Sequence, residues 1–153
     1  MEKYLPILRN SPFFKGLTDN EILSILHCVN ATAVSKERDS YIFRAGDFTE
    51  VMGLVVSGCV LVIQEDLWGH RNILSKCHTG DFFGEPYAAS PGAVLNVSVV
   101  ADTDCEIILL NVQRLLISCP TACEHHQKLI RNLVSVLANK ILVFNDKITH
   151  VGK

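Results

Sequence analysis

The chain has 153 residues and a net charge of −2, and 48% of its residues are hydrophobic while 20% are charged. These values are those of one ordinary globular domain with a sizeable core, and the slightly acidic balance gives no electrostatic basis for binding nucleic acid unaided. The start of the chain lacks the pattern of a secretory signal and no apolar run approaches the ~20 residues that cross a bilayer, so we expect a cytoplasmic protein with no membrane partner.

A short helix near the start is indicated by the sequence Thr18-Asp19-Asn20-Glu21, which has the pattern of a capping box. Apolar residues then follow at helical spacing, namely Ile22, Leu23, Ile25, Leu26 and Val29. Because these residues share one face of a helix, we expect an amphipathic helix that packs on the body of the domain.

From about Ala33 to Asn111 the chain divides into strand-length apolar runs separated by turns. The clearest runs are 54–56, 60–63, 97–101 and 106–110. The first two flank Ser57-Gly58, which is a signal for a tight hairpin, and the last two flank a polar turn at 102–104. Many short strands with regular turns predict a mainly β domain, either a sandwich or a jelly-roll barrel.

The end of the chain has the pattern of one long helix. No proline follows Pro120, and no glycine follows it until Gly152. About 28 helical residues would extend for ~42 Å. We therefore divide the chain into a body at residues 1–123 and a long helix at residues 124–153.

Apolar residues of this helix repeat with an unbroken 4-3-4-3-4-3 spacing, which is the a/d seam of a coiled coil. The seam residues are Ile130, Val134, Leu137, Ile141, Phe144, Ile148 and Val151. A second apolar stripe on a neighbouring face consists of Leu129, Leu133, Val136 and Val143. Because two apolar faces exceed what one small barrel needs to cover, we expect one stripe to cover the barrel and the seam to form a homodimer. The alternative is a helix folded wholly onto its own barrel.

Five motifs occur in order in the first part of the chain. They are Ser-Pro-Phe-Phe-Lys-Gly-Leu at 11–17, Phe-Arg-Ala-Gly-Asp at 43–47, Val-Met-Gly-Leu-Val-Val-Ser-Gly-Cys-Val at 51–60, Gly-His-Arg-Asn-Ile-Leu at 69–74 and Gly-Asp-Phe-Phe-Gly-Glu at 80–85. In this order and spacing they resemble the sensor domain of the Crp/Fnr transcription regulators, which has the cyclic-nucleotide-binding fold. The resemblance implies a double-stranded β-helix (jelly-roll) sensor domain followed by a long C-terminal dimerisation helix.

In the family this helix leads into a winged helix-turn-helix domain that binds DNA. We expect that second domain to be absent here, because Gly152-Lys153 falls where the hinge would begin. The chain then resembles an isolated sensor half that reaches DNA only through the missing domain. A natural stand-alone domain is the alternative.

The residues after Gly84-Glu85 depart from the family's cyclic-nucleotide binders, in which the Glu holds the ribose hydroxyl and a later Arg meets the cyclic phosphate. Leu95 falls where that Arg belongs, and no Arg or Lys occurs between Lys76 and Arg114. An Arg–phosphate contact contributes about 1.5–3 kcal/mol, or about one to two orders of magnitude in affinity. We therefore expect cyclic AMP to bind weakly or not at all, an expectation that a basic side chain brought to the turn from elsewhere would overturn.

The turn from Phe83 to Ala89 and the strand that opens at Leu95 are expected to face each other across a ligand pocket. The residues expected to bind the ligand are Phe83, Gly84, Glu85, Tyr87, Ala88, Asn96 and Asn139. Glu85 would accept a hydrogen bond from a ligand hydroxyl or amine, or else it caps the N–H groups of its own turn. The polar groups of Tyr87, Asn96 and Asn139 either contact the ligand or belong to ordinary packing and solvated surface.

The six cysteines do not predict disulfides, because the chain has no export signal. Cys59 and Cys105 lie in apolar strand patterns and are expected to be small buried hydrophobes. Cys119, Cys123 and His126 would share one helical face, but Pro120 indicates that the helix begins after Cys119, which breaks that geometry. We expect no metal and no other cofactor.

No Gly-x-Ser-x-Gly elbow and no His-x-His cluster occurs, so we do not expect an enzyme. We interpret the chain as the effector-binding and dimerising half of a Crp/Fnr-type regulator, whose effector is a small molecule other than a standard cyclic nucleotide. Three alternatives stay open. They are a redox or metal sensor that uses the cysteines, a true cyclic-nucleotide-binding domain with a non-standard phosphate site, and a pure dimerisation module with a collapsed pocket.

Overall fold

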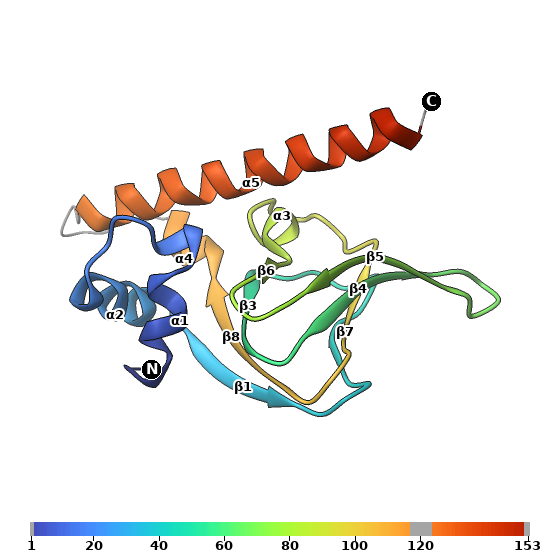
Figure 1. Ribbon diagram of the computed structural model, residues 1–153, viewed down its shortest axis with the longest axis horizontal. Helices are drawn as coiled ribbons and strands as arrows, with labels where there is room; N and C mark the ends of the chain where they lie inside the picture. The colour runs from blue at the N-terminus through green and yellow to red at the C-terminus, as the bar shows by residue number, and fades with distance from the viewer. Residues whose placement is uncertain (1, 117–123, 152–153) are drawn as a thin grey trace.

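The computed structural model describes residues 2–116 and 124–151, with side chains described at 2–115 and 127–142. Two four-stranded antiparallel sheets form the body, short helices gather at one end of it, and one long helix lies across the molecule (Figure 1). The expected mainly β jelly-roll fold with flanking helices and a long C-terminal helix is confirmed.

Strands that follow one another in the chain mostly belong to different sheets, which is the winding of a jelly roll. The sheets have the strand orders β1-β8-β3-β6 and β2-β7-β4-β5, and only β4 and β5 are both consecutive and paired. The strands are β1 (Thr32–Lys36), β2 (Tyr41–Phe43), β3 (Val51–Ser57), β4 (Val60–Glu65), β5 (Arg71–Cys77), β6 (Phe82–Phe83), β7 (Ser98–Ala101) and β8 (Cys105–Asn111).

The tight hairpin predicted at Ser57-Gly58 is wrong, because β3 and β4 lie in different sheets and the turn crosses from one sheet to the other. Gly58 has φ +81°, and a Cβ there would lie 2.5 Å from the Asp104 carbonyl oxygen. The Thr103 hydroxyl accepts a hydrogen bond from the Cys59 N–H at 3.1 Å. This crossing therefore packs against the equivalent crossing between β7 and β8. A local turn signal specifies a reversal of direction, but it does not specify which sheet receives the next strand.

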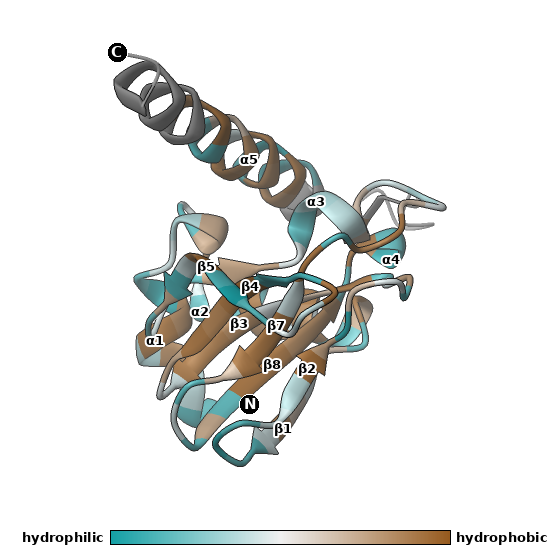
Figure 2. Ribbon diagram, turned by 90° about the vertical axis from the view of Figure 1, so that its right-hand side faces the viewer, coloured by the Kyte–Doolittle hydropathy of each residue, from teal (hydrophilic) through white to brown (hydrophobic). Residues whose placement is uncertain are grey.

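Apolar side chains from both sheets fill the space between them, and β3, β4 and β8 are predominantly hydrophobic in Figure 2. The buried residues of this inner core are Val55, Val60, Cys77, Phe83, Val99, Ala101, Cys105 and Ile107. Gly53 makes room for one of them, since a Cβ at this position would lie 2.1 Å from the Phe83 ring. Cys59 and Cys105 are buried, as expected.

Short helices cover the other face of the first sheet and form a second core with it. They are η1 (Glu2–Tyr4), α1 (Leu5–Arg9), η2 (Pro12–Phe14), α2 (Asp19–Cys28) and α4 (Val112–Leu116). The predicted capping box is confirmed at the start of α2, where the Glu21 N–H donates to Thr18 Oγ1 and the Thr18 N–H donates to Glu21 Oε1. The apolar face of α2 is buried through Ile22, Ile25 and Leu26.

The long helix α5 (Glu124–Val151) lies over α4 and over the single-turn helix α3 (Glu85–Ala88) in Figure 1. Leu129 and Leu133 are buried in the second core, so part of the predicted second stripe covers the body.

The predicted seam is divided between the body and solvent. Ile130 and Leu137 pack partly against the core, whereas the side chains of Val134 and Ile141 are 60% and 59% exposed. The seam side chains of Phe144, Ile148 and Val151 lie outside the described residues. The exposed positions are those that a second helix would have to cover.

Among the residues that the structure describes, no helix combines the length and the apolar content needed to span a membrane. The same residues contain no cluster of three or more His, Cys, Asp or Glu side chains that could hold a metal ion. Cys119, Cys123 and the side chain of His126 lie outside the described part of the chain.

Candidate functional site

The site is built on α3, which follows directly from β6. Gly84 joins the two with φ +81°, a left-handed conformation that costs a glycine little, and a Cβ there would come within 2.8 Å of the Phe43 ring. Because the chain turns so sharply, Glu85 becomes the first helical residue and its side chain is fully buried. At the other end of the turn, Ala88 is packed into the second core.

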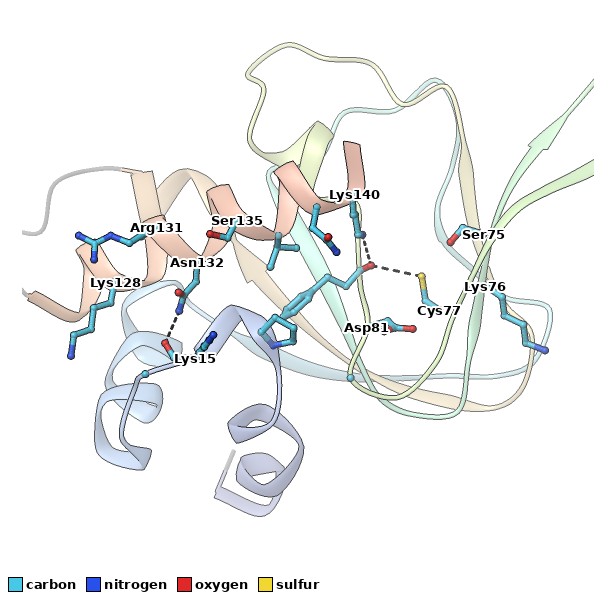
Figure 3. Close-up of a pocket in the computed structure, with 16 residues that line it drawn as sticks. Lys15, Ser75, Lys76, Cys77, Asp81, Lys128, Arg131, Asn132, Ser135 and Lys140 are labelled. Atoms are coloured by element: carbon cyan, nitrogen blue, oxygen red, sulfur yellow. Dashed lines mark hydrogen bonds between the residues drawn. The ribbon is translucent and has the colours of Figure 1, made fainter. Parts of the chain in front are cut away.

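The buried Glu85 carboxylate has a cationic partner on α5. The Lys140 ammonium pairs with Glu85 Oε1. It also donates to the Phe82 carbonyl oxygen at 2.9 Å, and Figure 3 shows this second contact. Apart from this ion pair, neither oxygen of Glu85 accepts a hydrogen bond of ordinary geometry from the residues described. A carboxylate with so few donors is costly to bury, so it is tertiary packing that holds Glu85 in place.

The expectation of a turn without a cation is therefore wrong, since Lys140 supplies one from a distant part of the chain. The sequence does contain a signal for it. The apolar stripe at 129, 133, 136 and 143 keeps a 4-3-4-3 spacing only if residue 140 is included. Lys140 thus occupies a body-facing position in a stripe whose other members are apolar, and a charge there requires a partner.

Leu95 occupies the position where the resemblance predicts an arginine, and its side chain is buried and apolar. It lines a cavity of about 360 Å³ together with Tyr41 and Arg44, whose guanidinium lies over the Tyr41 ring at 4.1 Å from the ring centre. The Phe83–Ala89 turn does not line this cavity. Neither this cavity nor the larger one described below is lined by both the turn and Leu95, so the pocket between them stays a prediction.

The two polar residues predicted to contact a ligand near the turn contact each other. The Tyr87 hydroxyl donates a hydrogen bond to Asn96 Oδ1. Partial burial of the Tyr87 phenol raises its pKa, so the hydroxyl remains a donor across the neutral range. Gln113 holds the same turn from α4, since its Nε2 donates to the Ala88 carbonyl oxygen at 2.8 Å. These bonds fix the turn without a ligand.

A larger cavity has a volume of about 800 Å³. One wall is formed by α5, a second by residues 12–16 around η2, and a third by the end of β5 and the turn that leads into β6. Its lining residues are Pro12, Lys15, Gly16, Ser75, Lys76, Cys77, Gly80, Asp81, Phe82, Lys128, Arg131, Asn132, Ser135, Val136, Asn139 and Lys140. Of the predicted ligand residues, Asn139 lines it, whereas Glu85 is linked to it only through Lys140. Phe83, Gly84, Tyr87, Ala88 and Asn96 do not line it.

The buried thiols near the site are held in the protonated form. Burial raises the pKa of Cys77, and its Sγ lies 3.7 Å from the Phe82 carbonyl oxygen that also accepts from Lys140. Burial raises the pKa of Cys59 and of Cys105 as well, and the Cys59 thiol donates to Asp102 Oδ2 at 3.3 Å. Reactive cysteines have lowered pKa values, so these thiols have the opposite character.

Comparison with known proteins gives one family match. The family model described as "Cyclic nucleotide-binding domain" matches residues 33–117. No curated protein matches the chain.

Solved structures share the fold at low sequence identity. The catabolite activator protein of Thermus thermophilus is 24% identical with a TM-score of 0.76, and the match covers 93% of this chain and 63% of that one. The sensor domain of the transcriptional regulator DNR from Pseudomonas aeruginosa is 16% identical with a TM-score of 0.73, and the match covers 97% and 95%. A regulatory subunit of a cAMP-independent protein kinase A from Trypanosoma brucei is 24% identical with a TM-score of 0.70, and the match covers 96% and 51%. This chain therefore spans less than two thirds of the length of the first and third of these structures.

Proposed function

The chain belongs to the cyclic nucleotide-binding domain family, and on that premise we propose that it is the effector-sensing domain of a Crp/Fnr-type transcription regulator. One observation carries this proposal: the fully buried Glu85 carboxylate on α3 is joined to α5 by Lys140. A sensor requires a ligand-contacting group and an element that responds to it. Here one ion pair joins the two.

The ion pair supplies a means of coupling. An effector that donates a hydrogen bond to Glu85 from a hydroxyl or an amine competes with Lys140 for the carboxylate. When Lys140 is displaced, α5 loses one of its contacts with the body. The effector therefore binds better to the released arrangement of the helix and shifts the population toward it.

The effector that we propose is a small, partly apolar molecule other than a standard cyclic nucleotide. Lys140 does stand beside the turn, so weak binding of cyclic AMP no longer follows from the sequence alone. We base it instead on the pairing of Lys140 with the buried Glu85 carboxylate, which leaves this cation neutralised, and on the apolar Leu95, which cannot pair with a phosphate. A phosphate at the turn would have to take Lys140 from a buried carboxylate and then lie beside that negative charge. The same fold occurs in the regulatory subunit of a cAMP-independent kinase, so it does not by itself imply cyclic AMP.

Titration calorimetry with cyclic AMP and cyclic GMP tests this proposal. We expect neither nucleotide to bind at micromolar concentration. Micromolar binding of either nucleotide would overturn the choice of effector class. The coupling through Glu85 and Lys140 could then be measured by the same titration with the bound nucleotide.

A second candidate function is favoured by the position of Lys140. In that case the domain binds a cyclic nucleotide, and Lys140 provides a non-standard phosphate site beside α3. The substitution Lys140→Met separates the two candidates. If a cyclic nucleotide binds the parent protein and not this variant, the second candidate holds.

We propose further that α5 forms the homodimer that transmits the signal. Val134, Ile141 and Leu142 are exposed apolar side chains on a helix whose Leu129 and Leu133 already cover the body. DNA is contacted, on this proposal, only by a separate helix-turn-helix domain, and the chain acts in the cytoplasm as a regulator without catalytic activity. The protonated buried thiols give no support to a redox function.

A further inference from the structure

The lining of the 800 Å³ cavity has a charge opposite to that of the whole molecule. Five lining residues are cationic, namely Lys15, Lys76, Lys128, Arg131 and Lys140, and one, Asp81, is anionic. The whole chain carries a net charge of −2. Gathering like charges around one hollow raises the electrostatic free energy of the folded state, and a bound anion would lower it.

Two of these cations already have carboxylate partners. Lys140 pairs with Glu85, and Lys76 Nζ lies 3.2 Å from Asp102 Oδ2. Lys15, Lys128 and Arg131 have no carboxylate partner among the side chains described. The cavity thus offers three cations whose charge nothing in the described protein neutralises.

The three cations are attached to a frame that is already ordered. Asn132 Nδ2 donates to the carbonyl oxygens of Phe13 and Lys15, each at 2.9 Å, and so ties α5 to the segment after η2. Lys128 and Arg131 lie on the same part of α5, and Figure 3 shows both side chains projecting from one end of the helix. Because the backbone positions are fixed before a ligand arrives, binding loses less conformational entropy.

We propose that this cavity binds a small polyanion with two or more phosphate or carboxylate groups, held by Lys15, Lys128 and Arg131. The planar Arg131 guanidinium suits two-pronged contact with either group, and the two lysines act as point charges. The volume of about 800 Å³ lies within the range of small-molecule sites, so the occupant is a small molecule.

This site is separate from the α3 turn and does not depend on the function proposed for that turn. Glu85 and Tyr87 do not line the cavity. Asn132 already links α5 to the body through its bond to the Lys15 carbonyl oxygen. A polyanion bound between Lys15 and the α5 cations Lys128 and Arg131 adds a second link, and therefore favours the arrangement in which α5 is docked on the body.

Titration calorimetry at low ionic strength tests the site, with tripolyphosphate and citrate as the two probes. The variant Lys128→Ala/Arg131→Ala removes two cavity cations, and Lys36→Ala/Arg71→Ala is the matched control because it removes the same charge from residues that do not line the cavity. We expect saturable binding of at least one probe, weakened about tenfold or more by the first variant and by less than about twofold by the control. The stronger probe identifies the anionic group.

A third variant, Glu85→Gln, distinguishes this site from the turn and should not weaken the affinity for the probes, because it leaves Lys15, Lys128 and Arg131 in place and frees the charge of Lys140 beside them. Lys15→Ala provides a check from the other side of the cavity and should weaken the affinity severalfold. The proposal is overturned if neither probe saturates, if the control weakens binding as much as the cavity variant, or if Glu85→Gln weakens it while Lys128→Ala/Arg131→Ala does not.

Discussion

Lys140 on α5 reaches the buried carboxylate of Glu85 on α3, so a single ion pair joins the long helix to the turn that we propose as the effector site. Its two ends differ, because Glu85 is fully buried while the Lys140 side chain is 47% exposed. Removing one partner is therefore not equivalent to removing the other.

Lys140→Met leaves the Glu85 carboxylate buried without its cation. We expect it to lower the free energy of unfolding by about 1–3 kcal/mol, less than the loss typical of fully buried pairs because Lys140 is half exposed. Glu85→Gln should cost less, since the released lysine remains partly in solvent. Urea unfolding of both single variants and of the double variant gives the coupling between them. A double variant whose loss equals the sum of the single losses would show that the pair contributes no coupling.

Val134→Asp/Ile141→Asp places two charges on the exposed part of the α5 seam. If α5 forms the dimer, we expect this variant to sediment as a monomer at concentrations at which the parent chain is dimeric, because each helix would bury two carboxylates in the shared interface, four in all. The control Phe48→Asp/Leu67→Asp replaces two exposed apolar residues outside α5 and should remain dimeric. A parent chain that is monomeric at high concentration contradicts the dimer itself.

Gly53→Ala should destabilise the roll by at least about 2 kcal/mol, because its Cβ would overlap the Phe83 ring that fills the inner core. Gly69→Ala is the control. Gly69 has φ +81° but open space around it, so only backbone strain of about 1 kcal/mol is expected there. Thermal unfolding compares the two variants. An equal or smaller loss for Gly53→Ala would mean that Phe83 can move aside.

The protein should lose stability in mild alkali. Burial raises the pKa of the Cys77 thiol above the value of about 8.5 expected in the unfolded chain. Below that pH both states keep the proton, and above it the unfolded state releases the proton first, so the free energy of unfolding falls as pH rises. Urea unfolding between about pH 8 and pH 10 should show this fall, and Cys77→Ala should reduce its slope.

The same burial should protect the thiols from chemical modification. We expect Cys59, Cys77 and Cys105 to react slowly with iodoacetamide at neutral pH in the folded protein and rapidly in urea. Mass spectrometry after labelling assigns the rate to each cysteine. Rapid labelling of any of these three in the folded state would favour the redox alternative over an effector-binding site.

Local patterns in the sequence predicted the parts of the fold that depend on local physics. The capping box at Thr18 and Glu21 specified the start of α2, and the absence of glycine and proline specified α5. The motif ending in Gly84-Glu85 identified the α3 turn. In each case the signal and the structure it specifies lie within a few residues of each other, or along one helix.

The errors came from interactions between distant parts of the chain. Ser57-Gly58 has the chemistry of a hairpin turn, but the choice of sheet for β4 is made by its pairing with β5 and β7. Lys140 and Glu85 meet only because α5 docks through Leu129 and Leu133. Turn chemistry and charge counting along the sequence do not identify such partners, and the helical spacing that places residue 140 on the body-facing stripe does not say which residue it meets.

The pairing of β1 with β8 sets the order in which the roll can be completed. Thr32 lies opposite Leu109 and Lys36 lies opposite Cys105, so β1 can pair only after β8, the last strand of the described roll, has been synthesised. Until then one edge of β1 is an open template for other chains, and closing so long a loop slows folding. A nascent chain stalled before β8 should therefore be the form of this protein that most needs a chaperone.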